Sequence, residues 1–355
     1  MPQSLPLIDG AEIDHAARLL RAGRLVAFPT ETVYGLGANA LDAEAVVRIF
    51  AVKGRPATSP LIVHVASIEM ARSLIATWPD AAARLARKFW PGPLTLVLPT
   101  SHGGTAALAG GPQTAWFSRP GVARRPGERS SAEFLSQPTI PLIVTAGLPT
   151  VGLRMPAHPL ALALIRAAGV PLAAPSANRF TQLSPTTAEH VRRSLGDDVD
   201  YILDGGPCRV GIESTVLSLA EPQPILLRPG GISRPEIEAV IGPVATAPDQ
   251  VAGAHPAPGM HPRHYSPRTP LFLVEDGRLP DQGQGIYLQH QHPPSRSDVK
   301  IISMPTPAPA YAATFYDALH QADAAGLDWI AVDLPPRTPD WEAVHDRLRR
   351  AASNS

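Results

Sequence analysis

The segment Phe28-Pro-Thr-Glu-Thr-Val-Tyr-Gly-Leu-Gly-Ala-Asn39 decides the fold class of this chain. The apolar residues 25–28 predict a buried strand that runs into it, and a helical pattern begins at Asp42. Between the two lie hydroxyl groups, one carboxylate and two glycines that admit a close backbone approach. Polar side chains concentrated where a strand ends are typical of a small-molecule site in an α/β protein.

The same segment contains a short match to a dinucleotide-binding pattern. Residues Gly35 to Ala40 fit G-x-G-x-x-G/A. That fingerprint needs its first glycine directly after the strand and an acidic residue about 20 positions further on. Here six residues separate Phe28 from Gly35, and no Asp or Glu lies between Glu44 and Glu69. A dinucleotide site is therefore disfavoured.

Composition limits the classes of function. With 355 residues, 44% of them hydrophobic and 17% charged, the chain is long enough for two domains and a substantial core. The formal net charge of +0 gives no general attraction to nucleic acid or to a membrane. One cysteine, Cys208, excludes an intramolecular disulfide and a multi-cysteine zinc site. No apolar run approaches about 18 residues and no leader pattern occurs, so we expect a cytoplasmic protein.

Alternating helical and extended patterns over residues 1–242 predict a first domain. Helical patterns cover residues 11–22, 42–52, 68–76, 80–89, 158–168, 186–195 and 234–241. Extended patterns cover residues 25–28, 61–65, 94–98, 142–145, 151–154, 171–174, 200–203, 215–219 and 224–228. Several of these expected strands are continuous apolar runs, which favours a sheet with both faces covered.

Two stretches interrupt this alternation. Residues 101–139 have loop composition and are too long for an ordinary connection, so we interpret them as an inserted flexible loop. Residues 243–269 have the composition of an inter-domain linker. Residues 270–355 then predict a small α/β domain. Its expected strands are 271–274, 285–288, 299–303 and 329–333, and its expected helices are 311–325 and 341–351.

Short motifs spread along the chain suggest a family. They are Phe28-Pro-Thr-Glu-Thr-Val-Tyr-Gly-Leu-Gly, Lys53-Gly-Arg55-Pro, Pro60-Leu-Ile-Val-His64, Trp90-Pro-Gly-Pro-Leu-Thr, Val151-Gly-Leu-Arg154-Met-Pro, Ala174-Pro-Ser176-Ala-Asn178, Gly211-Ile-Glu-Ser214-Thr and Leu227-Arg228-Pro-Gly. In this order and spacing they resemble the YrdC/TsaC-type threonylcarbamoyl-AMP synthases, in the long form with a C-terminal domain. The resemblance covers nearly the whole chain outside residues 101–139. It implies a YrdC-like twisted mixed sheet flanked by helices, followed by a smaller Rossmann-like α/β domain.

The resemblance implies a nucleotidyltransferase, an L-threonylcarbamoyladenylate synthase, that works in two stages. The amine of L-threonine is carboxylated with bicarbonate or CO2, and the carbamate oxygen then attacks the α-phosphate of ATP. Pyrophosphate leaves, and threonylcarbamoyl-AMP remains for the modification of adenosine 37 in tRNAs that read codons beginning with A. A separate tRNA threonylcarbamoyl transferase complex would use that product. Mg2+ is expected with the triphosphate, without assigned protein ligands.

By this resemblance the catalytic residues are Lys53, Arg55, Ser176 and Asn178. Phosphoryl chemistry spreads negative charge over oxygens, so preorganised cations and donors stabilise it. Lys53 and Arg55 are two residues apart and, if extended, would project from one side of the backbone. No Walker-type loop occurs, which favours side-chain cations as the triphosphate ligands. A solvated turn is the competing interpretation of Lys53-Gly-Arg55, and the presence of Ser176-Ala-Asn178 argues against it.

Ligand-binding residues are also implied by the resemblance. For ATP they are Arg55, Ser59, Thr150, Ser176, Ser184, Arg228 and Tyr265, and for L-threonine they are Thr32, His64, Arg154, the Ala174 backbone and Ser214. A planar guanidinium binds carboxylates with two hydrogen bonds, which suits Arg154 to the α-carboxylate. Structural alternatives are a core histidine for His64, an ion pair for Arg154 and a helix cap for Ser184. Ser59 departs from the Asn or His usual in the family, and Pro149 replaces an acidic residue.

Tyr265 lies in the expected linker, in the motif Ala257-Pro-Gly-Met-His-Pro-Arg-His-Tyr265-Ser-Pro. The resemblance implies that this segment folds over the nucleotide while the C-terminal domain closes the cleft. We predict the same gate here, because closure would exclude water from an adenylate prone to hydrolysis.

Two other functions compete with this interpretation. A double-stranded RNA-binding module is disfavoured by the neutral net charge and the absence of an aromatic RNA-binding motif, so we expect at most weak RNA binding. A carbamoyltransferase acting on another acceptor is disfavoured because the longer carbamoyltransferases carry extra domains and metal-binding finger regions that this chain lacks.

Overall fold

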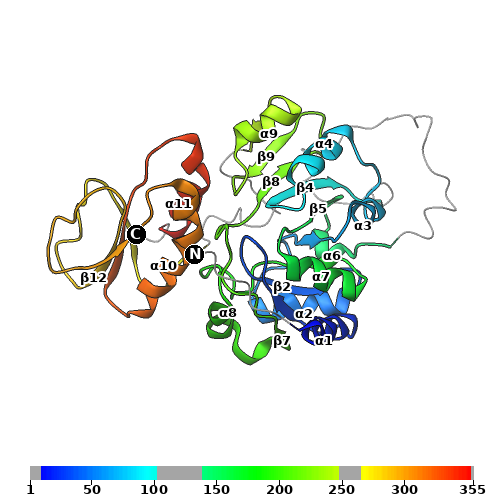
Figure 1. Ribbon diagram of the computed structural model, residues 1–355, viewed down its shortest axis with the longest axis horizontal. Helices are drawn as coiled ribbons and strands as arrows, with labels where there is room; N and C mark the ends of the chain where they lie inside the picture. The colour runs from blue at the N-terminus through cyan, green and yellow to red at the C-terminus, as the bar shows by residue number, and fades with distance from the viewer. Residues whose placement is uncertain (1–8, 102–137, 248–264, 353–355) are drawn as a thin grey trace, which may run out of the picture.

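Two β-sheets with flanking helices make up the protein. The computed structural model describes residues 9–101, 138–247 and 265–352. The smaller, C-terminal sheet lies to one side of the larger one (Figure 1). The α/β class predicted from the sequence is confirmed. The predicted domain boundaries stay predictions, and most of the expected loop 101–139 and linker 243–269 falls outside the described residues.

The larger sheet is mixed and has the strand order β10-β9-β8-β4-β5-β3-β6-β2-β1-β7. Its strands are β1 (Val26–Phe28), β2 (Gly35–Asn39), β3 (Ile62–His64), β4 (Leu94–Pro99), β5 (Thr150–Arg154), β6 (Leu172–Ala173), β7 (Tyr201–Ile202), β8 (Thr215–Ser218), β9 (Ile225–Arg228) and β10 (Ala245–Thr246). In its centre, β3 pairs in parallel with β5 and antiparallel with β6.

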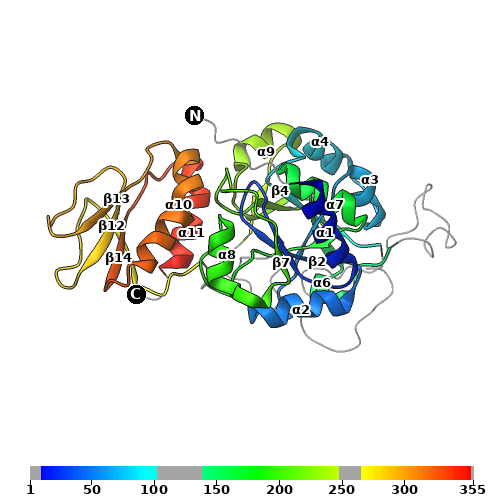
Figure 2. The same ribbon diagram turned by 60° about the horizontal axis from the view of Figure 1, so that its bottom comes forward.

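Helices cover both faces of this sheet (Figure 2). They are α1 (Gly10–Arg21), α2 (Ala43–Lys53), α3 (Ile68–Ser73), α4 (Asp80–Phe89), α6 (Leu142–Thr145), α7 (Pro159–Ala168), α8 (Ala188–Leu195) and α9 (Arg234–Ile241), with a 3-10 turn at Gly196–Asp198. Strand β1 shows that different helices cover the two faces of the sheet. Val26 and Phe28 pack with α1 and α7, while Ala27 belongs to the cluster that contains α2. Continuous apolar strands are therefore explained by helices on either side.

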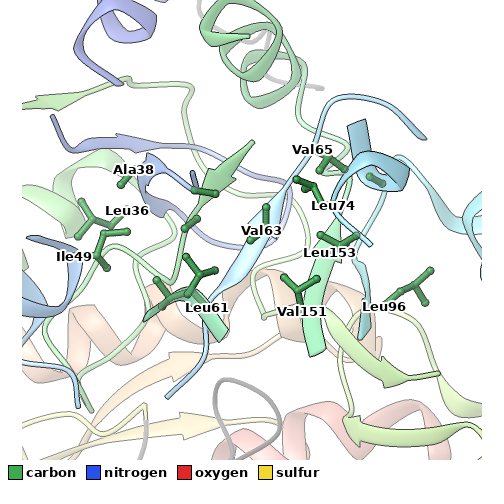
Figure 3. Close-up of a cluster of buried hydrophobic side chains, with 14 of the residues drawn as sticks. Leu36, Ala38, Ile49, Leu61, Val63, Val65, Leu74, Leu96, Val151 and Leu153 are labelled. Carbon is green, nitrogen blue, oxygen red and sulfur yellow. The ribbon is translucent and has the colours of Figure 1, made fainter. Parts of the chain in front are cut away.

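The main core fixes the strands that carry the pocket. Leu36, Val63 and Leu153 come from β2, β3 and β5 and share a buried cluster with Ile49 of α2 (Figure 3). All four side chains are fully buried. Burying a side chain of this size contributes about 1.5–3 kcal/mol. Because strand side chains alternate between faces, the neighbours of Val63 and Leu153 point to the other side of the sheet.

The smaller sheet is parallel, with the order β11-β14-β12-β13. Its elements are β11 (Leu271–Val274), β12 (Gly285–Gln289), β13 (Lys300–Ser303), α10 (Ala308–Ala324), β14 (Trp329–Asp333), a 3-10 turn at Pro339–Trp341 and α11 (Glu342–Ala351). The strands and helices expected in residues 270–355 are all present, with ends that differ by at most three residues.

Helices α10 and α11 lie between the small sheet and the rest of the molecule in both views (Figures 1 and 2). Tyr316 of α10 belongs to one buried cluster with Val33 and Ile212 of the larger domain. Backbone also meets backbone here: Gly211 has φ +74°, and a Cβ at this position would lie 2.4 Å from the carbonyl oxygen of Ala312. The two domains therefore share a closely packed interface that includes an apolar cluster.

A helix replaces the strand predicted at residues 142–145. Helix α6 follows Pro141 and ends at Ala146, whose φ of 53° is left-handed. A short apolar run fits a strand and a buried helical turn equally well by periodicity. The Val144 carbonyl accepts a hydrogen bond from the N–H of Leu61, the residue before β3.

Two strands are missing from the sequence prediction. Strand β2 contains Gly35 and Gly37, and glycine weakens a strand pattern. A Cβ at Gly37 would lie 2.7 Å from the Phe28 ring, which explains why this position holds a glycine. These glycines lie within a strand, so they do not form the strand-to-helix turn of a dinucleotide site. Strand β10 lies inside the expected linker and pairs with β9.

Candidate functional site

One pocket in the described structure collects most of the predicted site residues. Its empty volume is about 530 Å3, the solvent at its mouth included. The lining comes from strand ends and loops of the larger domain, joined by one tyrosine from the start of the last described segment. The lining residues are Thr30, Thr32, Val33, Gly35, Arg55, Ile62, His64, Arg154, Ala174, Pro175, Ser176, Glu213, Ser214, Arg228 and Tyr265.

All five residues predicted for L-threonine are in this lining, namely Thr32, His64, Arg154, Ala174 and Ser214. Strand pairing explains how distant motifs meet. The parallel register of β3 and β5 sets His64 beside Arg154, while Val63 and Leu153 face the core. The sequence places each residue at a strand end, and the strand order places the two side by side.

His64 is a neutral side chain at physiological pH. It is buried, and burial, followed by the nearby Arg154 charge, lowers its pKa to about 3. Its Nδ1 atom has no hydrogen-bond partner among the described residues. An orphaned buried nitrogen costs free energy unless a ligand or water satisfies it. His64 can therefore bind a ligand without adding positive charge.

A buried ion pair holds Arg154. Its Nη2 donates to Oε1 of Glu31 at 2.7 Å, and the second oxygen of Glu31 accepts from the Ala157 N–H at 2.9 Å. The two side chains are 5% and 4% exposed. Glu31 thus fixes the guanidinium beside the pocket. Sequence reasoning missed Glu31 as the partner of Arg154. The only sign of it in the sequence is that Glu31 is the single carboxylate of the segment from Phe28 to Asn39.

Two further arginines give the pocket positive charge. Arg55 donates from Nη2 to the Pro60 carbonyl at 3.0 Å, and its Nε has no partner among the described residues. Burial lowers the pKa of Arg55 to about 10, so it stays charged at neutral pH. Arg228 donates from Nη2 to the carbonyl and the hydroxyl of Ser214, at 2.8 and 3.2 Å.

Lys53 lies behind the pocket lining rather than in it. Its Nζ donates to the carbonyl of Ser176 at 2.6 Å and also to the carbonyl of Asn178. The expectation of an extended Lys53–Arg55 pair is wrong, because Lys53 ends α2 and Gly54 is left-handed with φ 63°. Burial, and then the charge of Arg55, hold the pKa of Lys53 well below its usual range.

The remaining predicted residues divide between the pocket and its surroundings. Ser176 lines the pocket, whereas Asn178, Ser59, Thr150 and Ser184 lie outside the lining. The amide of Asn178 donates to two backbone carbonyls, so it shapes the loop after β6. The helix-cap alternative for Ser184 does not apply, because the side chain of Thr187 caps α8. Ser184 donates instead to Glu213, at 2.5 Å.

Tyr265 forms part of the pocket wall. It is 1% exposed and has a φ of 66°, uncommon for a residue with a side chain. The following Ser266 N–H donates to the Thr181 carbonyl at 2.9 Å, which ties this segment to the larger domain. The gate predicted for the linker stays a prediction, since residues 248–264 are outside the described structure.

Glu213 and Thr30 line the pocket although the sequence analysis did not select them. The hydroxyl of Thr30 bonds to that of Thr32 at 2.8 Å and donates to the Val33 carbonyl at 2.7 Å, so it orders the loop after β1. Glu213 directly precedes Ser214 in the motif Gly211-Ile-Glu-Ser214-Thr, and this position is the only sign in the sequence that it could line the pocket.

The described residues contain no group of three or more His, Cys, Asp or Glu side chains that could hold a metal ion. In the same part of the chain, no helix is long and apolar enough to cross a bilayer. The fold and the site together define a two-domain α/β protein with a cationic, hydroxyl-lined pocket that suits small anionic ligands.

Comparisons with known proteins specify the family. A family model described as telomere recombination, for Sua5, YciO and YrdC proteins, matches residues 18–115 and 130–230. A model described as the C-terminal domain of threonylcarbamoyl-AMP synthase matches residues 232–353. The threonylcarbamoyl-AMP synthase of Bacillus subtilis (strain 168) is 41% identical over 362 residues, covering 96% of this chain and 93% of that protein.

Archaeal relatives agree with this match. The threonylcarbamoyl-AMP synthase of Pyrococcus abyssi is 45% identical over 274 residues, covering 76% of this chain and 70% of that protein. A crystal structure of P. abyssi Sua5 complexed with L-threonine has a TM-score of 0.80 at 38% identity, covering 98% of this chain and 95% of that one. The chain belongs to the threonylcarbamoyl-AMP synthase family and is an enzyme, which confirms the resemblance drawn from its motifs.

Proposed function

We propose that this enzyme forms threonylcarbamoyl-AMP and pyrophosphate from L-threonine, bicarbonate or CO2, and ATP. The main support is that one pocket brings the His64–Arg154 pair together with two other buried cations, Arg55 and Arg228. An amino-acid carboxylate and a triphosphate are anions that such a pocket suits. The P. abyssi structure crystallised as a complex with L-threonine agrees with this assignment.

L-threonine occupies the end of the pocket at β3 and β5. Arg154 binds the α-carboxylate through its guanidinium, which Glu31 holds in place. Neutral His64 adds a hydrogen bond without further charge. Thr32, Ser214 and the Ala174 backbone complete this half of the site with polar groups.

ATP occupies the end of the pocket near Arg55, Arg228 and Tyr265. The two arginines stabilise negative charge on the phosphate oxygens. Ser176 is a neutral donor in the lining. Lys53 and Asn178 act indirectly, through the loop after β6. Lys53 donates to the carbonyls on either side of Ala177, and Asn178 shapes the same loop. Ser59, Thr150 and Ser184 lie outside the pocket lining, so any contact of theirs with ATP would be made beyond it.

The reaction proceeds in two bond-forming steps. The threonine amine attacks the carbon of CO2 and loses a proton to give the carbamate. Starting from bicarbonate, that proton leaves together with the hydroxyl group as water. A carbamate oxygen then attacks the α-phosphorus, the bond from that phosphorus to the bridging oxygen of the β-phosphate breaks, and pyrophosphate leaves. The fixed positive charges of Arg55 and Arg228 oppose the charge that develops on the phosphate oxygens.

Magnesium enters as part of the MgATP substrate. The pocket carboxylate of Glu213 is already bonded to Arg347, Tyr316 and Ser184, so it is a poor metal ligand. Phosphate oxygens and water would supply most ligands, as is usual for this cation. The product would pass to a tRNA threonylcarbamoyl transferase complex for modification of adenosine 37, and we place the reaction in the cytoplasm.

One incubation tests this function. Purified protein is mixed with L-threonine, bicarbonate and MgATP, and the adenylate is detected by mass spectrometry while pyrophosphate is measured. Formation of both products should stop when L-threonine or ATP is omitted and fall when bicarbonate and dissolved CO2 are removed. Absence of the adenylate with all substrates present would refute the proposal. Double-stranded RNA binding and carbamoyl transfer to another acceptor gain no support from the comparisons.

A further inference from the structure

Glu213 is a pocket residue whose partners come largely from the other domain. It is 6% exposed and lines the pocket immediately before Ser214. Its carboxylate accepts hydrogen bonds from Ser184 Oγ at 2.5 Å, from Tyr316 OH at 3.1 and 3.2 Å, and from Arg347 Nε at 2.8 Å. Tyr316 belongs to α10 and Arg347 to α11, so the C-terminal domain supplies two of these three side chains.

Arg347 contacts two residues of the pocket lining, Glu213 and Tyr265, and the residue next to a third. Its side chain is fully buried. Besides Glu213, it donates from Nη1 to the carbonyl of Pro229 at 2.9 Å, next to Arg228, and to Oδ2 of the buried Asp346 at 2.7 Å. Its guanidinium carbon lies 5.4 Å from the centre of the Tyr265 ring, within the range of a cation–π contact. Through the side chain of Arg347, helix α11 therefore contacts the ATP end of the pocket.

The charge of this network matters for an anionic ligand. Burial acts to raise the pKa of Glu213, but Arg347 and then Arg228 outweigh it, and the pKa is held below its usual range. The carboxylate is therefore ionised and pairs with Arg347. Arg347 also pairs with Asp346, which keeps a second partner in Arg350. A buried carboxylate that loses its partner repels other anions strongly, because the low local dielectric weakens screening.

We propose that Arg347 of the C-terminal domain is a positioning residue for the reaction. It does not touch substrate; it neutralises Glu213 and supports Ser184, Arg228 and Tyr265, so the ATP end of the pocket is complete only when α11 is docked. The inference rests on the function proposed above. It also explains why an enzyme with its pocket in one domain packs a second domain against that pocket.

A double-mutant cycle tests the charge relation. Arg347→Met keeps much of the apolar volume but strands the Glu213 carboxylate, and we expect kcat/KM for MgATP to fall by roughly 10²-fold. The affinity for L-threonine, measured by calorimetry, should change far less, because Arg347 contacts the ATP-assigned Tyr265 and the carbonyl next to Arg228 but, among the described residues, none assigned to L-threonine. Adding Glu213→Gln removes the stranded charge and should restore kcat/KM at least about tenfold over Arg347→Met.

The pH profile separates this role from packing alone. In Arg347→Met, the groups facing Glu213 are Ser184, Tyr316, Arg228 and Tyr265, with Asp346 nearby on α11. Without Arg347, burial should raise the pKa of the carboxylate. Activity of Arg347→Met relative to the wild type should therefore increase as the pH falls from 8 to 6. The double variant with Glu213→Gln should show no such increase.

Controls keep the outcomes decisive. Arg349→Met changes an exposed arginine of the same helix and should behave as the wild type. If Arg347→Met does not fold by circular dichroism, Arg347→Met/Glu213→Gln is compared with Glu213→Gln alone, and the two should agree within about threefold. Unchanged kcat/KM in Arg347→Met, or no recovery on adding Glu213→Gln, would overturn the inference.

The proposed function can fail separately from this inference. If the wild type makes no adenylate, the function is refuted, and the same cycle can be followed through the binding of MgATP measured by calorimetry. Weaker MgATP binding in Arg347→Met with recovery in the double variant would still support the role of Arg347. Equal MgATP binding in all variants would overturn it.

Discussion

Lys53 shows how much one buried charge can depend on its surroundings. The residue is 3% exposed, and its Nζ donates to the backbone carbonyls of Ser176 and Asn178, so it holds the loop after β6 against the end of α2. Lys53 therefore affects the phosphate end of the pocket through the shape of that loop. Arg55, two residues on, lines the pocket directly.

Replacing Lys53 by alanine should lower turnover by roughly 10²–10³-fold, the usual loss when one preorganised donor is deleted. Pyrophosphate release measures the effect. Lys88→Ala is the matched control, because Lys88 is an exposed residue of α4 and should leave turnover unchanged. Release at the wild-type rate by Lys53→Ala would remove Lys53 from the mechanism.

His64 should make stability depend on pH. Its pKa is near 6.5 in an unfolded chain and about 3 in the folded protein, where burial and Arg154 disfavour the charged form. The unfolded state therefore gains protons first as the pH falls, and the free energy of unfolding decreases between about pH 6.5 and pH 3. Between pH 7 and pH 5, the free energy of unfolding should fall by about 2 kcal/mol less in His64→Gln than in the wild type. Urea unfolding at both pH values measures this, and equal losses would contradict it.

At the scale of elements, strand β2 links the core to the pocket. Leu36 and Ala38 face the main core, while Gly35 lines the pocket and forms an isolated bridge with Ser176. The glycines of this strand leave room for Phe28 and for the loop after β6. Close packing of β2 thus brings the opening motif and the Ser176 motif together.

Gly37→Ala should destabilise the first domain by about 1–3 kcal/mol, because the added methyl would lie 2.7 Å from the buried Phe28 ring and 3.2 Å from the Val26 carbonyl. The midpoint of urea unfolding measures the change. Gly10→Ala, where no atom lies within 4 Å of the added Cβ, is the control and should be nearly neutral. A Gly37→Ala protein as stable as the wild type would show that β2 can shift without cost.

At the scale of the whole molecule, the second domain supports a pocket that is lined by the larger domain and Tyr265. The larger domain has its own buried clusters, and the interface cluster adds Val33, Leu183 and Ile212 to the core of the C-terminal domain. The larger domain should therefore fold alone but with an incomplete ATP end. Arg347 and Tyr316 would be absent, and Glu213 would face the pocket without them.

Deleting residues 248–355, which leaves β10 in the larger sheet, should reduce turnover by roughly 10²-fold or more. The thermal midpoint of the larger domain should fall comparatively little. Pyrophosphate release and a melting curve followed by circular dichroism give the two measurements. Binding of L-threonine to the truncated protein, measured by calorimetry, is a control for an intact first domain. An unchanged Michaelis constant for ATP together with unchanged turnover would argue against the role of the second domain.

Local patterns in the sequence were sufficient for most of the fold. Apolar periodicity predicted α1, α2 and β3 to within about three residues, and caps and glycines marked their ends. It failed at α6, where three apolar residues and a threonine fit either structure, and at β2, where glycines weaken the strand pattern. Strand order over ten strands is set by contacts distant in the sequence, which local periodicity does not contain.

The chain by itself determined which residue types carry the chemistry: the cations, hydroxyls and histidine of the quoted motifs, and with them the family. Tertiary structure alone decided that Lys53 binds carbonyls behind the pocket, that Glu31 holds Arg154, and that Arg347 reaches Glu213 from the other domain. The physical reason is that residue identity is a property of the sequence, whereas burial and ion pairing depend on which distant segments are packed together.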